Sequence, residues 1–475
     1  MSDAIQPIVN AARARFVLLT LLLASVPLFA LILGALDTGY LLAVAVVLVA
    51  AAAFAVHSRE GTAATFPLRL IFLLLIVGFF VKAVAILAVL ELDADPPIEG
   101  MSAELVRDEE LLRYGYGIAA IGFVAFTLGS VVALRLMPIL KQGWQEASVR
   151  DDLRARRLCQ MFFAIVLVLC LATAYAQYAT GVGVMGRNIT LPYRLAGAIV
   201  HPRNVVIPYL LLVLAWVADR TGQRRLHLAI CVALALHALC QTMLMASRGM
   251  LLLLLLPLFV LWVSTSRTSA LRQLGIVVLT SVVVLAYPLL SALRVIRAAE
   301  PTAAVWEQMG EAHQARAQSS DAPARILFRI SGIDNLLVSV QYGEPGFEFE
   351  HMARMLFDRE RTFNMIYTQD YAGYGPYNEV HGSAPSLIGA FYVLGGTPLV
   401  LLGCIAWPLC IAGGIRLGER CCIYSGPPAV AFITVVALTV TLEGTVDDVP
   451  RLAPFYVLAL ILGEFGVRRI AQGPP

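Results

Sequence analysis

A series of long apolar runs, most of them without a charged residue, constrains this chain more than any other feature. A run of about 20 such residues spans a bilayer as a helix, and a soluble core of this size has no stable place for several of them. The composition agrees, since 59% of the 475 residues are hydrophobic and only 14% are charged, against roughly a quarter charged in soluble domains. We therefore predict an integral membrane protein. The net charge of +3 is too close to neutral to indicate nucleic acid as a partner.

Hydropathy windows predict an all-α protein with about twelve transmembrane helices. These spans are expected at 16–36, 40–56, 68–90, 114–134, 158–179, 205–218, 226–245, 250–264, 273–291, 385–414, 427–442 and 452–465. The sixth, eighth, eleventh and twelfth are short for a bilayer, so neighbouring helices or flanking polar residues must compensate. The tenth is overlong and contains Pro398 and Pro408, so we expect it to tilt or break.

Basic residues set the orientation of these spans, because cytoplasmic loops are enriched in Lys and Arg. Arg13 and Arg15 precede the first span and no clear small-residue cleavage site follows it, so we interpret this segment as a signal anchor. With the N-terminus in the cytoplasm, every second loop is rich in Arg, and the short opposite loops are acidic or nearly uncharged. The pattern predicts that both termini are cytoplasmic.

One long polar segment, residues 292–384, separates an N-terminal bundle of about nine helices (1–291) from about three C-terminal helices (385–475). The predicted topology places this segment on the non-cytoplasmic side, together with residues 181–204 and the turn around Arg248. These outward segments are nevertheless rich in Arg. Positive charge on this side opposes the usual insertion bias, so we expect it to bind an anion.

Within the long segment, apolar residues recur at the spacing of one helix face. The stripe consists of Ile326, Ile330, Ile333, Leu337 and Val340, and Arg325 and Arg329 lie one turn apart beside it. One interpretation is a helix on the membrane surface with its cations turned toward a site. The other is a helix packed on the transmembrane bundle with solvated arginines, because amphipathic packing alone explains the stripe.

Arg248 is the sharpest single feature, because it lies in a very short turn between two apolar helices. An Arg at hydrocarbon depth costs roughly 2.5–3.5 kcal/mol on insertion scales and so indicates a function, and its planar fork suits contact with phosphate. The helix before it also carries His237 and Gln241. The alternative is an interfacial Arg whose charged head reaches water.

Further outward cations are expected near the same anion. Arg187, Arg194, His201 and Arg203 cluster within residues 181–204. Lys82, inside the third span, is a weaker case, since it could reach the interface or pair internally.

A histidine stands where the chain re-enters the bilayer after the long segment. His381 follows a Gly-, Tyr- and Pro-rich stretch and lies near Glu379 and Asp370, so it could act as a general base or a phosphate ligand. The alternative is a solvated loop histidine. None of the eight cysteines lies in the long segment and no Cys/His spacing matches a zinc site, so we expect neither a disulfide framework nor a metal.

Four stretches at these positions resemble the bacterial oligosaccharide repeat-unit polymerases, the Wzy-type O-antigen and exopolysaccharide polymerases. They are Leu191–Gly197, Ser247–Gly249 (which the related O-antigen ligases also carry), Arg329–Asp334, and His381–Gly389 followed by Tyr392 and Gly395–Gly396. Their order, their sidedness and the hydropathy layout resemble that family over nearly the whole chain.

The resemblance implies a GT-C-like polytopic bundle in the bacterial inner (cytoplasmic) membrane, with short helices in a large periplasmic loop. It implies a metal-independent membrane glycosyltransferase without a cofactor. Such an enzyme moves a growing glycan from undecaprenyl pyrophosphate onto a lipid-linked oligosaccharide repeat unit at the periplasmic face. Its partners would be these undecaprenyl-pyrophosphate-linked oligosaccharides, membrane lipid and a chain-length regulator.

The resemblance and the outward cations together imply roles for particular residues. The residues expected to serve catalysis are Arg248, His381, Asp334 and Glu379. Those expected to bind substrate are Arg194, Arg187, Arg203, Arg329 and Arg325. An inverting transfer needs a base for the acceptor hydroxyl, and Asp334, Glu379 and His381 remain alternatives for that role.

Two other functions stay open at this point. An O-antigen ligase would share Ser247–Gly249 and would transfer finished polymer to lipid A-core. A secondary transporter or flippase could also have twelve spans, but transporters normally place polar groups near the midplane and often show internal repeats. No repeated half is visible in this sequence, and its polar residues gather at one face.

Overall fold

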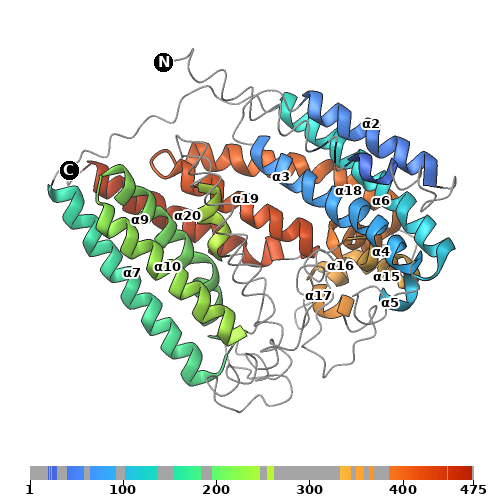
Figure 1. The fold of residues 1–475 in the computed structure, drawn as a ribbon. Coiled ribbons are helices and arrows are strands. Elements are labelled where there is room, and N and C mark those ends of the chain that lie inside the picture. Colours follow the sequence, from blue (N-terminus) through green and yellow to red (C-terminus); the bar gives the residue numbers. More distant parts are fainter. Residues whose placement is uncertain are drawn as a thin grey trace. The chain divides into compact units, whose positions relative to one another are not determined.

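The computed structural model describes residues 20, 22, 24–28, 40–57, 65–91, 102–136, 153–182, 195–245, 254–261, 332–343, 349–357, 363–368, 385–446 and 448–472. Nearly all of these residues are helical, and no β-strand occurs among them (Figure 1). The prediction of an all-α protein is confirmed for this part of the chain.

Eight of the described helices are long and apolar enough to cross a membrane. They are Pro67–Glu91, Glu109–Leu136, Leu153–Thr180, Gly197–Arg220, Arg224–Met245, Ser386–Cys421, Gly426–Glu443 and Val449–Ala471. Each corresponds to a predicted span, and the shorter apolar helix α2 (Leu41–His57) matches the second. Several helices of this length and apolar composition are typical of a membrane protein. The first, eighth and ninth predicted spans lie wholly or partly outside the described residues, so the total of twelve stays a prediction.

Two of the spans that were expected to be short for a bilayer are long enough to cross it. The sixth, expected at 205–218, runs from Gly197 to Arg220, because α8 (Leu195–His201), the π-helical segment η4 (Pro202–Val206) and α9 (Ile207–Arg220) join end to end. The twelfth, expected at 452–465, is α20 (Asp448–Gln472). A hydropathy average falls at polar residues such as Arg203, whereas helical hydrogen bonding continues through them. The expectation that these two spans are short was therefore wrong.

The chain divides into two compact units. Unit 1 takes its described residues from Met1–Ile139, Pro323–Arg416 and Val436–Val449, and unit 2 from Leu140–Ala322, Leu417–Val435 and Pro450–Pro475.

In unit 1, α6 (Glu109–Leu136) packs against α2 and against the third span, which consists of α3 (Thr65–Leu75), the π-helical segment η2 (Ile76–Val81) and α4 (Lys82–Glu91). Aromatic rings link these helices. The ring of Phe72 lies 4.2 Å from that of Phe54 and 4.7 Å from that of Phe123, measured between centroids. The three side chains are fully buried and form part of the core of unit 1.

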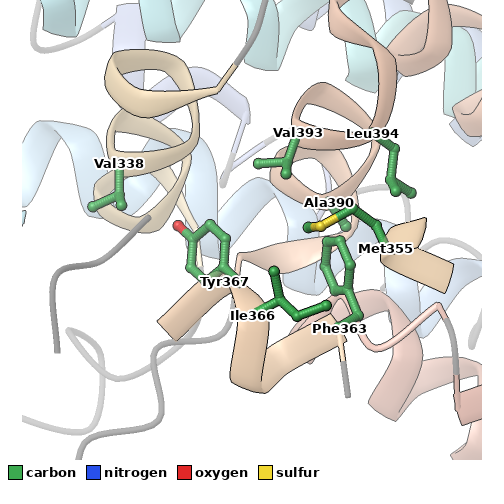
Figure 2. Packing of buried hydrophobic residues seen from close by; sticks show 8 residues of the cluster. All are labelled: Val338, Met355, Phe363, Ile366, Tyr367, Ala390, Val393 and Leu394. Carbon is green, nitrogen blue, oxygen red and sulfur yellow. The ribbon is translucent and has the colours of Figure 1, made fainter. Parts of the chain in front are cut away.

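Three short helices of the long polar segment also belong to unit 1: α15 (Ile333–Tyr342), α16 (Phe349–Phe357) and α17 (Phe363–Ile366). Figure 2 shows apolar side chains from these helices meeting those of α18 (Ser386–Cys421) in one cluster. Its buried members are Val338, Met355, Phe363, Ile366, Tyr367, Ala390, Val393 and Leu394. The long segment is therefore tied to a membrane-spanning helix by a hydrophobic core of its own.

The described part of the predicted apolar stripe lies inside this packing. Ile333 and Leu337 are fully buried, and α15 contacts α6, α4 and α5 (Ser102–Leu105). The expectation of a helix lying on the membrane surface was wrong for these residues, and the alternative of packing on the bundle is confirmed. Ile326, Ile330, Arg325 and Arg329 lie outside the described residues.

The first turn of α15 approaches the third span backbone to backbone. Gly332, which precedes α15, lies so close to Gly78 of η2 that a Cβ atom at Gly332 would overlap the Gly78 carbonyl oxygen. Any larger residue at position 332 would force the two elements apart.

The tenth span is broken as predicted. Gly395 and Gly396 leave helical geometry inside α18, and Gly396 has φ of 64°, a left-handed value that glycine adopts without steric cost. Pro398 follows, and it has no N–H to donate. His351 of α16 donates from Nε2 to the carbonyl oxygen of Val393 at 3.1 Å. This bond satisfies one of the carbonyls next to the break.

Unit 2 contains α7 (Leu153–Thr180), the sixth span and α10 (Arg224–Met245). α9 packs along both α7 and α10, as Figure 1 shows. In the same unit, Glu464 of α20 accepts hydrogen bonds from the backbone N–H groups of Tyr424 and Ser425 and from the Ser425 hydroxyl, at 2.9 to 3.1 Å. This carboxylate stabilises the start of α19 (Gly426–Glu443), where a negative charge is favourable.

Candidate functional site

Two of the residues predicted for the site lie in the described part of the chain, Arg203 in unit 2 and Asp334 in unit 1. The others lie outside it: Arg187, Arg194, Arg248, Arg325, Arg329, Glu379 and His381. Their roles stay predictions.

Arg203 lies in η4, where the sixth span changes from α-helical to π-helical geometry. Pro202 begins this segment, because a proline ring has no N–H and crowds the carbonyl four residues earlier. The hydrogen-bond ladder shifts by one residue, so the N–H of Ile207 donates to the carbonyl of Pro202, five residues back. Such π-helical turns frequently occur at functional sites. Arg203 is 1% exposed, and helical rise puts it roughly 9 Å along the axis from Gly197.

An imidazole and a thiol contact Arg203, and a second thiol contacts the imidazole. Its Nη2 donates to Sγ of Cys240 on α10 at 3.2 Å. The Nε2 of His237, also on α10, donates to the Arg203 carbonyl oxygen at 2.9 Å. Since Nε2 then carries the ring proton, Nδ1 accepts from Sγ of Cys170 on α7 at 3.1 Å. Three helices therefore hold the backbone at Arg203 in one position.

The charge of Arg203 has no counter-ion in the described part of the chain. Its Nε and Nη1 are buried and donate no hydrogen bond to a described residue, and it forms no ion pair with a described carboxylate. A buried charge without a partner is strongly unfavourable, and charged residues inside membrane spans usually mark functional sites. The two N–H groups therefore have donor capacity that no described residue uses.

A second open polar atom lies on the neighbouring helix. Gln241 of α10 is 0% exposed, and its Nε2 donates to Oδ1 of Asn204 at 2.6 Å. The amide of Asn204 in turn donates to Sδ of Met245 at 3.9 Å. These contacts orient the Gln241 amide, and its Oε1 accepts no hydrogen bond from any described residue. Oγ1 of Thr242 is buried and without a partner in the same way.

We call these residues the Arg203 cluster. It consists of Cys170, Arg203, Asn204, His237, Cys240, Gln241 and Thr242.

Asp334 is in the opposite situation. Its Oδ1 lies 2.7 Å from Nζ of Lys82, and the side chains of Asp334 and Lys82 are 7% and 0% exposed. Lys82 therefore pairs internally, which was one of the two expectations for it. Oδ1 of Asp334 is therefore occupied by an ion pair inside unit 1. This pairing argues against Asp334 as the base, and the other two candidates, Glu379 and His381, lie outside the described residues.

Sequence reasoning identified Arg203, His237 and Gln241 but not Asn204, Cys170 or Cys240. His237 and Gln241 stand four residues apart, which places them on one face of α10, and Asn204 directly follows Arg203. The two cysteines carry no comparable signal, because Cys is as common in buried apolar helices as in sites. Among the described residues, no group of three or more His, Cys, Asp or Glu side chains could hold a metal ion.

No protein-family model, no curated protein and no solved structure matches the chain.

Proposed function

We propose that this chain is a polysaccharide polymerase, a membrane glycosyltransferase that moves a growing glycan from undecaprenyl pyrophosphate onto a lipid-linked oligosaccharide repeat unit. The observation that carries the proposal is the buried guanidinium of Arg203, whose Nε and Nη1 have no partner among the described residues. The oxygens of a pyrophosphate would satisfy these donors. The resemblance of Leu191–Gly197, Ser247–Gly249 and His381–Gly389 to the Wzy-type polymerases supports the same activity.

In the proposed reaction, the acceptor hydroxyl attacks the anomeric carbon of the growing glycan. The bond between that carbon and the pyrophosphate oxygen breaks, and undecaprenyl pyrophosphate leaves with the electron pair. Its negative charge grows in the transition state, so fixed guanidinium groups lower the barrier. Arg203 would be one of them, with Arg248 and Arg194 as the next candidates. The hydroxyl proton would go to Glu379 or His381, since Asp334 is held by Lys82.

The proposal includes a location and a topology. The protein would lie in the bacterial inner membrane as a GT-C-like bundle of twelve spans with both termini in the cytoplasm. The Gly197 end of the sixth span would then face the periplasm, and Arg203 would lie just inside that end. This depth suits a lipid pyrophosphate whose tail stays in hydrocarbon and whose glycan stays in water.

The test is the length of the polysaccharide that cells make with Arg203→Met, Arg248→Ala or Arg194→Ala in place of the wild-type chain. Each variant should abolish the long-chain ladder on a gel and leave single repeats on the lipid carrier. The matched control is Arg224→Met, because Arg224 is exposed at the opposite end of α10. Undiminished long chains from normally expressed Arg203→Met protein would refute the proposal. Full-length polymer left on the lipid carrier would instead identify a ligase.

A secondary transporter or flippase is the second candidate, and the break in α18 favours it. Discontinuous membrane helices often line substrate sites in transporters, and Gly395 and Gly396 interrupt α18 inside its apolar length. Movement of a lipid-linked repeat across proteoliposomes by purified protein, without elongation, would establish that function.

A further inference from the structure

We infer that the Arg203 cluster recognises a sugar hydroxyl together with the phosphate beside it, and that Gln241 is the residue that confers this specificity. The ligand would be a glycosyl pyrophosphate lipid, in preference to the bare pyrophosphate lipid. This inference rests on the proposed function and names the part of the substrate that the same site distinguishes.

The open atoms of the cluster are of two kinds. Nε and Nη1 of Arg203 can only donate, and Oε1 of Gln241 can only accept. An ionised pyrophosphate satisfies the first pair but has no proton to give to the second. Oε1 would then stay buried without a donor, which is unfavourable by the desolvation of that atom. A hydroxyl on the sugar ring supplies the missing donor, and Oγ1 of Thr242 could accept or donate a further bond.

The two kinds of atom are held in a fixed relation. Gln241 is tied at 2.6 Å to Asn204, the residue next to Arg203, and His237 is tied at 2.9 Å to the Arg203 carbonyl oxygen. Gln241 and His237 also lie on the same face of α10, one turn apart. Neither polar group has to be ordered when a ligand arrives, and such preorganisation increases selectivity.

This specificity would assist turnover. The transfer consumes a glycosyl pyrophosphate and releases bare undecaprenyl pyrophosphate. Once the sugar has left, Oε1 of Gln241 loses its donor, so the spent carrier binds less tightly than the substrate did. A site that recognised only the pyrophosphate would hold both equally and would retain its product.

The experiment measures binding of defined lipids to the purified full-length chain in nanodiscs. The probes are undecaprenyl pyrophosphate, the same lipid carrying one hexose, and a series in which each hexose hydroxyl in turn is replaced by fluorine. Fluorine is close to a hydroxyl in size but cannot donate. We expect one fluorinated member to bind about five- to tenfold more weakly than the parent, which corresponds to one hydrogen bond. Gln241→Met should erase this difference, so that all members of the series bind this variant alike.

The controls separate this inference from the proposed function. Gln223→Met should keep the difference, because Gln223 lies just before α10 at its opposite end, where it donates to Thr221. If all fluorinated lipids bind wild-type protein like the parent, the inference is overturned, and loss of all binding in Arg203→Met would still support the proposed function. Binding that Arg203→Met leaves intact would overturn both.

The comparison of parent and fluorinated lipids uses the wild-type chain, so it holds even if a variant fails to fold. A second variant, Gln241→Glu, places a carboxylate where it can pair with Arg203. It should weaken all of the lipids together, and unchanged binding by this variant would contradict the placement of Gln241 beside the ligand.

Discussion

Lys82 in unit 1 and Arg203 in unit 2 are both cations buried inside apolar membrane-spanning helices. Lys82 directly follows a π-helical segment and Arg203 lies within one. Lys82 has a carboxylate at 2.7 Å, contributed by Asp334 from the long polar segment. Arg203 has a thiol at 3.2 Å and, within the described residues, no carboxylate. The contrast separates two uses of a buried charge: an internal ion pair fixes one element against another, whereas an open cation is available to a ligand.

The largest expected effect on stability is at the buried Lys82–Asp334 ion pair. Lys82→Met should lower the free energy of unfolding by about 3–5 kcal/mol, because Asp334 is left buried without its partner. Lys82→Met combined with Asp334→Leu should recover most of this loss. Thermal unfolding in detergent measures both effects. Arg113→Met, which removes the exposed pair with Glu109 at 3.0 Å, is the control and should change stability by less than about 1 kcal/mol. A Lys82→Met protein as stable as wild type would show that the pair does not hold α15.

The next largest effect on stability is expected at the backbone contact between Gly332 and Gly78, which joins the same two elements as the Lys82–Asp334 pair. Gly332→Ala places a methyl group against the Gly78 carbonyl oxygen, and such overpacking should cost about 1–3 kcal/mol. Gly117→Ala in α6 is the control, since nothing lies within 4 Å of a Cβ there. That substitution should raise stability by up to about 1 kcal/mol through helix propensity. Equal melting temperatures for the two variants would contradict the close approach of α15 to η2.

A smaller effect on stability is expected at His237, which holds the backbone of Arg203. His237→Phe removes the donor to the Arg203 carbonyl oxygen and should cost about 1 kcal/mol. His227→Phe removes a similar bond, at 2.9 Å, to the Ala215 carbonyl oxygen. The two variants should lose similar stability, but only His237→Phe should shorten the polysaccharide. Equal chain lengths from both would mean that His237 does not position Arg203 for a ligand.

The smallest effect on stability is expected at Arg203 itself. Arg203→Met removes a buried charge that has no described counter-ion, so stability should stay within about 1 kcal/mol of wild type or rise. Comparing its melting temperature with that of Lys82→Met measures the difference between a buried cation with a counter-ion and one without a described counter-ion. A loss as large as that of Lys82→Met would show that Arg203 is a structural cation.

The sequence predicts the helices well and their contacts poorly. Apolar runs mark the spans because helices in lipid need uninterrupted apolar length. Pro398 and Pro408 indicated that α18 would tilt or break, but the break itself lies at Gly395 and Gly396. The stripe through Ile333 and Leu337 predicts a helix but not its location, because surface helices and packed helices share that pattern. The Lys82–Asp334 pair joins residues 252 positions apart, and no local signal connects them.

In the candidate site, too, some residues could be predicted from the sequence but their contacts could not. Arg203 was predicted from its charge in an outward segment, and His237 and Gln241 were noted as polar residues in an apolar helix. The open donors of Arg203 and the open acceptor of Gln241 could not be predicted, because they depend on which neighbours satisfy each atom in three dimensions. Hydropathy windows also began the sixth span too late, at residue 205, because the polar Arg203 lowers the average hydropathy before that point.

Elongation by purified protein would show whether the chain itself polymerises lipid-linked repeats. Lipid-linked repeat units, extracted from source cells that lack this chain, are incubated in proteoliposomes with wild-type protein, Arg203→Met or Arg224→Met. We expect a ladder of longer glycans with wild type and Arg224→Met, and only single repeats with a folded Arg203→Met protein. A ladder from Arg203→Met, or repeats moved across the membrane by wild type without elongation, would contradict this expectation.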